Sequence, residues 1–253
     1  AGELPVGFNR GPWFGRLIGG DQPMNLHFVT PSYTSGTKGL QRGHVLIEPA
    51  TEAELKRMRH QLKGAWVLVS GKNVGWPVDH SAKADSIRNA IKAENVKIEQ
   101  MNDSLMKENW TKGAHHKTIP LRRMSGLFYK EMCEVGVLGF IQSASVPLRA
   151  LYDRPLVNDK NTTFDNLPEV CDIKLDEHQY AVIEQMAKER REFWLEFDIR
   201  NHFKLGPVKY HNVVASIKGT KYPDEYVIIS GHLDAFDVAT GGIDCGTGIG
   251  PMM

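Results

Sequence analysis

The residues best suited to chemistry lie near the C-terminus, in the segment GHLDAFDVATGGIDCGTG (231–248). An apolar run, YVIISG (226–231), leads directly into His232 and Asp234, and a glycine-rich loop carrying Asp244 follows. A neutral imidazole and carboxylates are typical zinc ligands. His232 and Asp234 are two residues apart, so on an extended segment both side chains leave the backbone on the same side. Asp234 could therefore orient the His232 imidazole or bind a cation itself.

Asp244 lies between Gly242 and Gly246, and glycines allow a backbone to turn tightly and to approach a ligand closely. Because a carboxylate has two oxygens, Asp244 could bridge two metal ions. A pair about 3.5–4 Å apart can share a water and lower its pKa toward about 7. The order of strand, His-x-Asp, glycine loop and Asp indicates a metal site. An isolated His-x-Asp is more often a surface or hydrogen-bonded histidine, and these residues alone leave that interpretation open.

Buried strands should position this site, because sites in open α/β sheets form beyond the carboxyl ends of parallel strands. YVIISG (226–231) and GAWVLVSG (64–71) are continuous apolar runs that predict strands buried on both faces. The stretch 193–219 alternates in part and predicts a strand, a turn at Gly206-Pro207 and a second strand. The stretch LFYKEMCEVGVLGFIQSAS (127–145) predicts a helix, a glycine turn and a strand.

Two helices have clear N-terminal signals. Thr51 as N-cap and Glu54 three residues later predict a capping box. Asp176 is predicted to cap a second helix, whose buried stripe should be Val182, Ile183 and Met186.

A third, strongly polar stretch covers residues 81–109 and carries one narrow apolar stripe. It predicts a long exposed helix, or a helical hairpin, lying on the domain. A partner-binding or dimer-forming helix is the alternative. The stripe consists of Ala84, Ile87, Ile91, Ile98, Met101 and Leu105.

The composition is that of an ordinary globular protein, with 253 residues, 41% hydrophobic and 24% charged. A formal net charge of +1 gives no indication of nucleic-acid binding. The sequence contains no apolar run of about 18 residues, so no transmembrane helix is predicted. Cys133, Cys171 and Cys245 are far apart and form no CxxC pair, so neither a disulfide framework nor a zinc knuckle is indicated. Residues 1–41 are dense in Gly, Pro, Ser and Asn and predict an irregular wrap.

The segment PDEYVIISGHLDAFDVATGGIDCGTG (223–248) closely resembles the metal-binding segment of the zinc-dependent exopeptidases, a family that includes bacterial leucyl aminopeptidases and plasma glutamate carboxypeptidase. The resemblance covers roughly residues 208–253. It implies a site for two zinc ions in which His232 binds one zinc, Asp244 bridges both and Asp234 supports His232. Cys245 stands where the family usually has an aspartate, joined to the bridging residue by a cis peptide, and is a candidate neighbour of the metal.

The preceding strand, helix, strand and capped helix resemble the family's protease-associated domain. Three domains are therefore predicted: an irregular wrap (1–41), a protease-associated-like domain with a helical insertion near 84–109 (42–190), and the truncated start of an α/β zinc-peptidase domain (191–253). The fold class is α/β, or α+β.

The resemblance implies the N-terminal part of a di-zinc metallo-exopeptidase, an aminopeptidase or a carboxypeptidase, that hydrolyses peptide substrates with zinc-activated water. The family's general base and its remaining ligands lie downstream of this segment, so the chain alone is expected to be inactive. A non-catalytic protease-associated binding module and a glutaminyl cyclase-like enzyme with one zinc are the alternatives. Relatives with a protease-associated domain are mostly exported, which implies a periplasmic or secreted location, although no signal peptide is visible.

Overall fold

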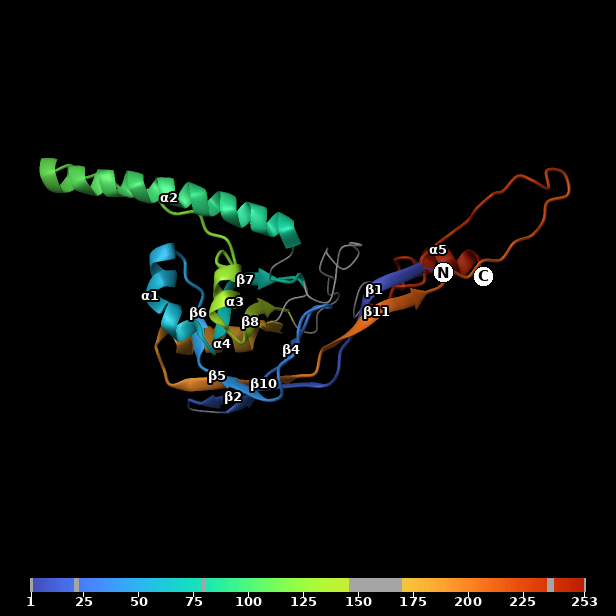
Figure 1. Ribbon diagram of the computed structural model, residues 1–253, viewed down its shortest axis with the longest axis horizontal. Coiled ribbons are helices and arrows are strands. Elements are labelled where there is room, and N and C mark those ends of the chain that lie inside the picture. The colour runs from blue at the N-terminus through green and yellow to red at the C-terminus, as the bar shows by residue number, and fades with distance from the viewer. Residues whose placement is uncertain (1, 21–22, 79–80, 146–169, 236–238, 253) are drawn as a thin grey trace.

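The computed structural model describes residues 2–20, 23–78, 81–145, 170–235 and 239–252. Two sheets and their covering helices form the body of the molecule (Figure 1). A long helix reaches out from one side of the body, and a two-stranded ribbon reaches out from the other (Figure 1). The predicted metal-site segment follows the ribbon along the chain.

The larger sheet has five strands, of which four are parallel to one another and the fifth is antiparallel at one edge. The predicted strand at 64–71 is confirmed as part of β7, whose residues Trp66 to Val69 are buried on both faces. Parallel strands of this kind read as continuous apolar runs, which is why the sequence identified β7. In spatial order the strands are β4 (Phe28–Val29), β9 (Cys171–Asp176), β8 (Gly139–Ala144), β7 (Trp66–Asn73) and β6 (Val45–Ile47).

The predicted helix caps are confirmed. The Thr51 hydroxyl accepts a hydrogen bond from the Glu54 N–H at 3.1 Å at the start of α1 (Glu52–Leu62). The Asp176 carboxylate accepts from the N–H groups of His178 and Gln179, both at 3.1 Å, at the start of α4 (Glu177–Lys188).

The helix and the glycine turn predicted between β7 and β8 are confirmed as α3 (Tyr129–Val135) and Gly136, which has a φ of 94°. One detail of α4 differs from the prediction. Val182 is 48% exposed, whereas Tyr180, Ile183 and Met186 are buried against the sheet, so the buried stripe includes Tyr180 in place of Val182.

A second, antiparallel sheet shares its core with the first. The indole N–H of Trp66 on β7 donates to the Leu195 carbonyl at 3.1 Å, and its ring meets Phe197 edge-on with centroids 4.8 Å apart. The core therefore continues past residue 190, where the sequence predicted a domain boundary. In spatial order the strands are β3 (Met24–Asn25), β2 (Trp13–Gly19), β10 (Phe193–Ile199) and β5 (Gln41–Gly43).

Residues 1–41 were predicted to be irregular, and this prediction is wrong where the segment forms regular strands. β1 (Gly2–Asn9) and β2 both pair with strands from the far end of the chain. The glycines of this segment suggested turns in the sequence, but in the structure they allow close packing between strands. A Cβ added at Gly15 would lie 2.6 Å from the ring of Phe197, so only glycine allows β2 to approach the core at this point.

The two-stranded ribbon consists of β1 and β11 (His202–Tyr210) in antiparallel register. The predicted turn at Gly206-Pro207 is wrong. The chain turns at Arg200 and Asn201, and Gly206-Pro207 lies inside β11 with a cis peptide bond. Proline has no backbone N–H to donate to a neighbouring strand. The ribbon accommodates it because the strand register shifts between Leu4 and Val6, opposite this proline.

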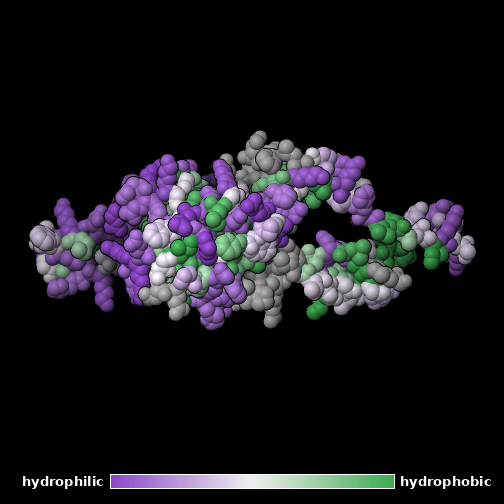
Figure 2. Space-filling view, turned by 90° about the horizontal axis from the view of Figure 1, so that it is seen from below, coloured by the Kyte–Doolittle hydropathy of each residue, from purple (hydrophilic) through white to green (hydrophobic). Residues whose placement is uncertain are grey.

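The strand predicted at 226–231 does not form, and this prediction is wrong. Residues 211–235 contain no regular element, and Val227 and Ile228 are 94% and 83% exposed. A strand buried on both faces needs neighbours to take its backbone hydrogen bonds, and no strand among the described residues pairs with this run. Apolar surface consequently gathers on the part of the molecule that extends to the right in Figure 2.

The polar stretch at 81–109 forms a single helix of 32 residues, α2 (Ser81–Lys112), so the prediction of a long helix is correct and the hairpin is not observed. Ala84 and Ile98 of the predicted stripe are buried, whereas Ile87 and Met101 are 44% and 46% exposed. The distal half of α2 extends beyond the body (Figure 1).

Three asparagines spaced seven residues apart fix an extended segment, residues 113–122, along α2. Each side-chain amide donates to a backbone carbonyl and accepts from the N–H of the same residue, at 2.7 to 2.9 Å. Seven helical residues rise about 10.5 Å, close to the reach of three extended residues. The pairs are Asn95 with Arg122, Asn102 with Ile119, and Asn109 with His116.

Replacing Asn102 by Ala will loosen this segment. The change removes two exposed hydrogen bonds, so we expect a loss of about 1 kcal/mol, equivalent to roughly fivefold faster amide exchange at Ile119. Hydrogen exchange measured by NMR tests this. Asn89→Ala, at an exposed position of the same helix, is the matched control. Equal exchange at Ile119 in both variants would contradict the prediction.

Candidate metal site

The candidate site joins an extended segment to a compact loop. His232 and Asp234 lie on the segment that follows β11, and Asp244 and Cys245 directly precede the short helix α5 (Gly246–Ile249). The Gly246 N–H donates to the Gly241 carbonyl at 3.0 Å, which closes the loop. A Cβ added at Gly246 would lie 2.8 Å from that carbonyl oxygen, so this close approach requires glycine.

The His232 imidazole lies between two aspartates. Its Nε2 is 2.9 Å from Asp244 Oδ1. Its Nδ1 is 2.9 Å from both the carbonyl oxygen and Oδ1 of Asp234. The two ring nitrogens thus face different carboxylates, an arrangement in which one nitrogen can bind a metal while the other is held in place.

These side chains are open to solvent, with exposed fractions of 49% for His232, 87% for Asp234 and 71% for Asp244. The hydrogen bond to the Asp234 carbonyl, followed by the one to the Asp244 carboxylate, favours the protonated ring and raises the pKa of His232. A metal ligand must be neutral imidazole, so a bound cation would displace this proton.

Cys245 belongs to the same group. One ligand atom each of His232, Asp244 and Cys245 lies within 4.8 Å of the others, and no other such group occurs in the part of the chain that the structure describes. The peptide bond between Asp244 and Cys245 is cis. Imidazole nitrogen, carboxylate oxygen and thiolate sulfur are all zinc ligands. Two ligands of a tetrahedral zinc stand about 3.3 Å apart, so a small opening of the contact between His232 and Asp244 would admit the ion.

His232, Asp234 and Asp244 were identified as candidate metal-site residues from their types and spacing in the sequence. Cys245 was treated as a candidate neighbour of the metal, because it follows Asp244 in the glycine loop, where the family usually has an aspartate. The position of its sulfur depends on how that loop folds. No glutamate belongs to the group formed by the described residues.

Residues 212–253 match peptidase family M28. Within the curated proteins, carboxypeptidase Q of Rattus norvegicus is 48% identical over 52 residues and that of Bos taurus 54% over 50 residues. These matches cover 19% and 18% of this chain, and each covers 11% of the relative's own length. The resemblance to zinc-dependent exopeptidases predicted from the sequence is therefore confirmed.

The fold is similar to that of a solved structure. The crystal structure of the peptidase M28 precursor from Shewanella amazonensis SB2B superposes with a TM-score of 0.51 at 17% sequence identity. The match covers 98% of this chain and 47% of that one. The α/β fold class is thus confirmed. None of the helices in the described ranges combines the length and the apolar character needed to cross a membrane.

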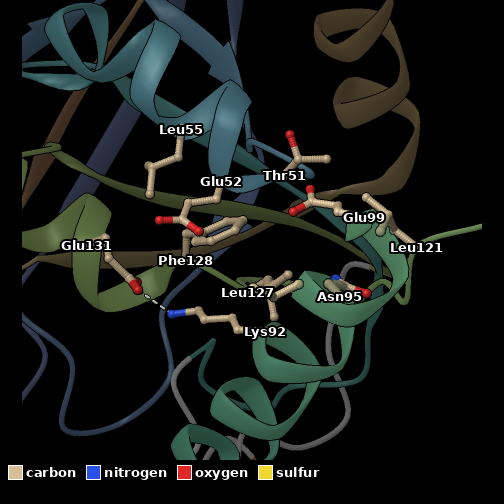
Figure 3. Close-up of a pocket in the computed structure, with 11 residues that line it drawn as sticks. Thr51, Glu52, Leu55, Lys92, Asn95, Glu99, Leu121, Leu127, Phe128 and Glu131 are labelled. Carbon is tan, nitrogen blue, oxygen red and sulfur yellow. Dashed lines mark hydrogen bonds and ion pairs between the residues drawn. The ribbon is translucent and has the colours of Figure 1, made fainter. Parts of the chain in front are cut away.

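A cavity of about 190 Å³ lies apart from the metal group, among α1, α2 and α3 (Figure 3). Leu55, Leu127 and Phe128 form apolar walls. Lys92 pairs with Glu131 across one side of the cavity. None of these side chains carries a signal for function in the sequence.

Proposed function

We propose that this chain contributes the first ligands of the metal site of an M28 zinc exopeptidase, of the aminopeptidase or the glutamate carboxypeptidase type. The observation that carries the proposal is the position of the His232 imidazole between Asp234 and Asp244, in a segment that matches this family. Zinc, two ions in the complete site, would supply a Lewis acid that lowers the pKa of water.

Each residue has a distinct role in this proposal. His232 would bind through Nε2, the nitrogen that faces Asp244. Asp244 offers two oxygens and would be the residue able to hold both ions. Asp234 contacts Nδ1, so it fixes the orientation of the ring and raises the basicity of its other nitrogen.

Peptide hydrolysis also requires a base that takes a proton from the attacking water. The described group contains no glutamate, and Asp234 is engaged with His232. We propose that the base and the remaining ligands come from residues outside this group, and that the 253-residue chain by itself does not hydrolyse peptides.

The test uses the protein expressed from the complete coding sequence, with the 253-residue chain assayed alongside. We expect hydrolysis of aminoacyl or dipeptide substrates that a chelator abolishes and zinc restores, and none with the 253-residue chain. Hydrolysis that survives both chelation and His232→Ala would rule the proposal out. Cyclisation of peptides with N-terminal glutamine, with release of ammonia, would instead support the single-zinc glutaminyl cyclase reading.

The cavity among α1, α2 and α3 favours a second candidate, a protease-associated domain that binds a partner or substrate without catalysis (Figure 3). The same assay separates the two, because a binding module gives no chelator-sensitive hydrolysis. On the resemblance to exported relatives we also propose a periplasmic or secreted location, which cell fractionation measures.

A further inference from the structure

Cys245 is the residue by which this loop departs from the family pattern, which has two successive aspartates at these positions. Its sulfur lies in the group formed with His232 and Asp244, within 4.8 Å of their ligand atoms. Gly248 leaves room for the sulfur, since a Cβ added there would lie 3.1 Å from Sγ. The thiol is half-buried, in contrast to the exposed Asp244 beside it.

We propose that Cys245 is itself a metal ligand, binding through its thiolate together with His232 and Asp244. The inference rests on the proposed zinc site and adds one donor to it. Three protein ligands with an open fourth position are the usual set at catalytic zinc sites. The thiol loses its proton to solvent as the sulfur–metal bond forms, and no electron is transferred.

A thiolate changes which metals the site prefers. Sulfur is a soft donor that favours zinc and cadmium, whereas a site of carboxylates also suits magnesium and manganese. With Cys245 as a ligand, this loop should therefore select soft divalent ions more strongly than its relatives with aspartate at the same position.

The other two cysteines serve as internal controls. Cys171 is 1% exposed, and burial, followed by the charge of Asp172, raises the pKa of its thiol to about 12. Cys133 is half-buried on α3 and does not belong to the metal group. Neither is expected to supply a thiolate to an ion bound at His232.

Cadmium titration of the 253-residue chain tests the proposal, because a thiolate bound to Cd²⁺ gives an ultraviolet charge-transfer band. We expect one equivalent of Cd²⁺ to produce the band and Zn²⁺ to displace it. Cys245→Ser should abolish the band. It should also weaken Cd²⁺ binding by at least about 100-fold, since losing residues that merely support a ligand already costs 10–100-fold. Cys133→Ser should retain both the band and the affinity.

Either of two results overturns the inference: no band at saturating Cd²⁺, or an unchanged band and affinity in Cys245→Ser. The proposed zinc site is judged separately, by zinc affinity measured against a competing chelator in His232→Ala and Asp244→Asn. If these two variants lose affinity and Cys245→Ser does not, the zinc site stands without a sulfur ligand. If all three bind zinc as the parent chain does, the proposed zinc site fails as well.

Discussion

Under the proposed function, replacing Asp244 by Asn in the protein expressed from the complete coding sequence will lower kcat/KM for peptide hydrolysis by more than about 100-fold. Replacing Asp234 by Ala will lower it about 10–100-fold, the usual cost of removing a residue that supports a metal ligand. The difference follows from the geometry. Asp244 faces Nε2 of His232 and would bind the metal itself, whereas Asp234 contacts the opposite ring nitrogen.

The two variants should also differ in zinc content measured by atomic absorption. Asp244→Asn removes a charged ligand, so we expect substoichiometric zinc. Asp234→Ala should retain more zinc, because the backbone carbonyl of residue 234 also contacts Nδ1 of His232 at 2.9 Å. Asp224→Asn, at an exposed carboxylate on the same segment, is the control. A larger loss in Asp234→Ala than in Asp244→Asn would reverse the assigned roles.

Features that depend on a few neighbouring residues were predictable from the sequence. The caps at Thr51 and Asp176 need only a side-chain oxygen and an N–H two or three residues away. β7 was predictable because burial on both faces requires an uninterrupted apolar run. The proximity of His232 and Asp234 also follows from local geometry alone.

Features that depend on partners far away in the sequence were not predictable. The run at 226–231 has the composition of a buried strand, yet pairing needs neighbouring strands that the described residues do not provide. β2 was missed for the opposite reason, since its glycines look like turn residues until Phe197 packs against Gly15. The asparagines of α2 carry no distinct signal in the sequence, because their role depends on a segment that returns along the helix.

The same division applies to the metal group. Asp244 was proposed as a ligand from the order of motifs, since the glycine loop marks it. The position of the Cys245 sulfur depends on the turn that brings Gly246 onto the Gly241 carbonyl, and no spacing rule predicts that turn.

Replacing Trp66 by Ala will lower the free energy of unfolding by about 3–5 kcal/mol, which is the usual cost of truncating a buried aromatic side chain. Trp66 is 0% exposed and links the two sheets. Its indole N–H donates to the Leu195 carbonyl on β10, and its ring contacts Phe197 edge-on. The variant leaves a cavity between the sheets and also deprives a buried carbonyl of its donor.

Urea unfolding measures this loss as a lower midpoint at an unchanged slope. Trp66→Phe retains most of the ring but removes the N–H, so we expect an intermediate loss of about 1–3 kcal/mol from the unpaired Leu195 carbonyl. Trp110→Ala on α2 is the matched control, because Trp110 is 91% exposed and its truncation should cost about 1 kcal/mol or less. If Trp66→Ala and Trp110→Ala shifted the midpoint equally, the two sheets would not share the core that Trp66 is inferred to hold together.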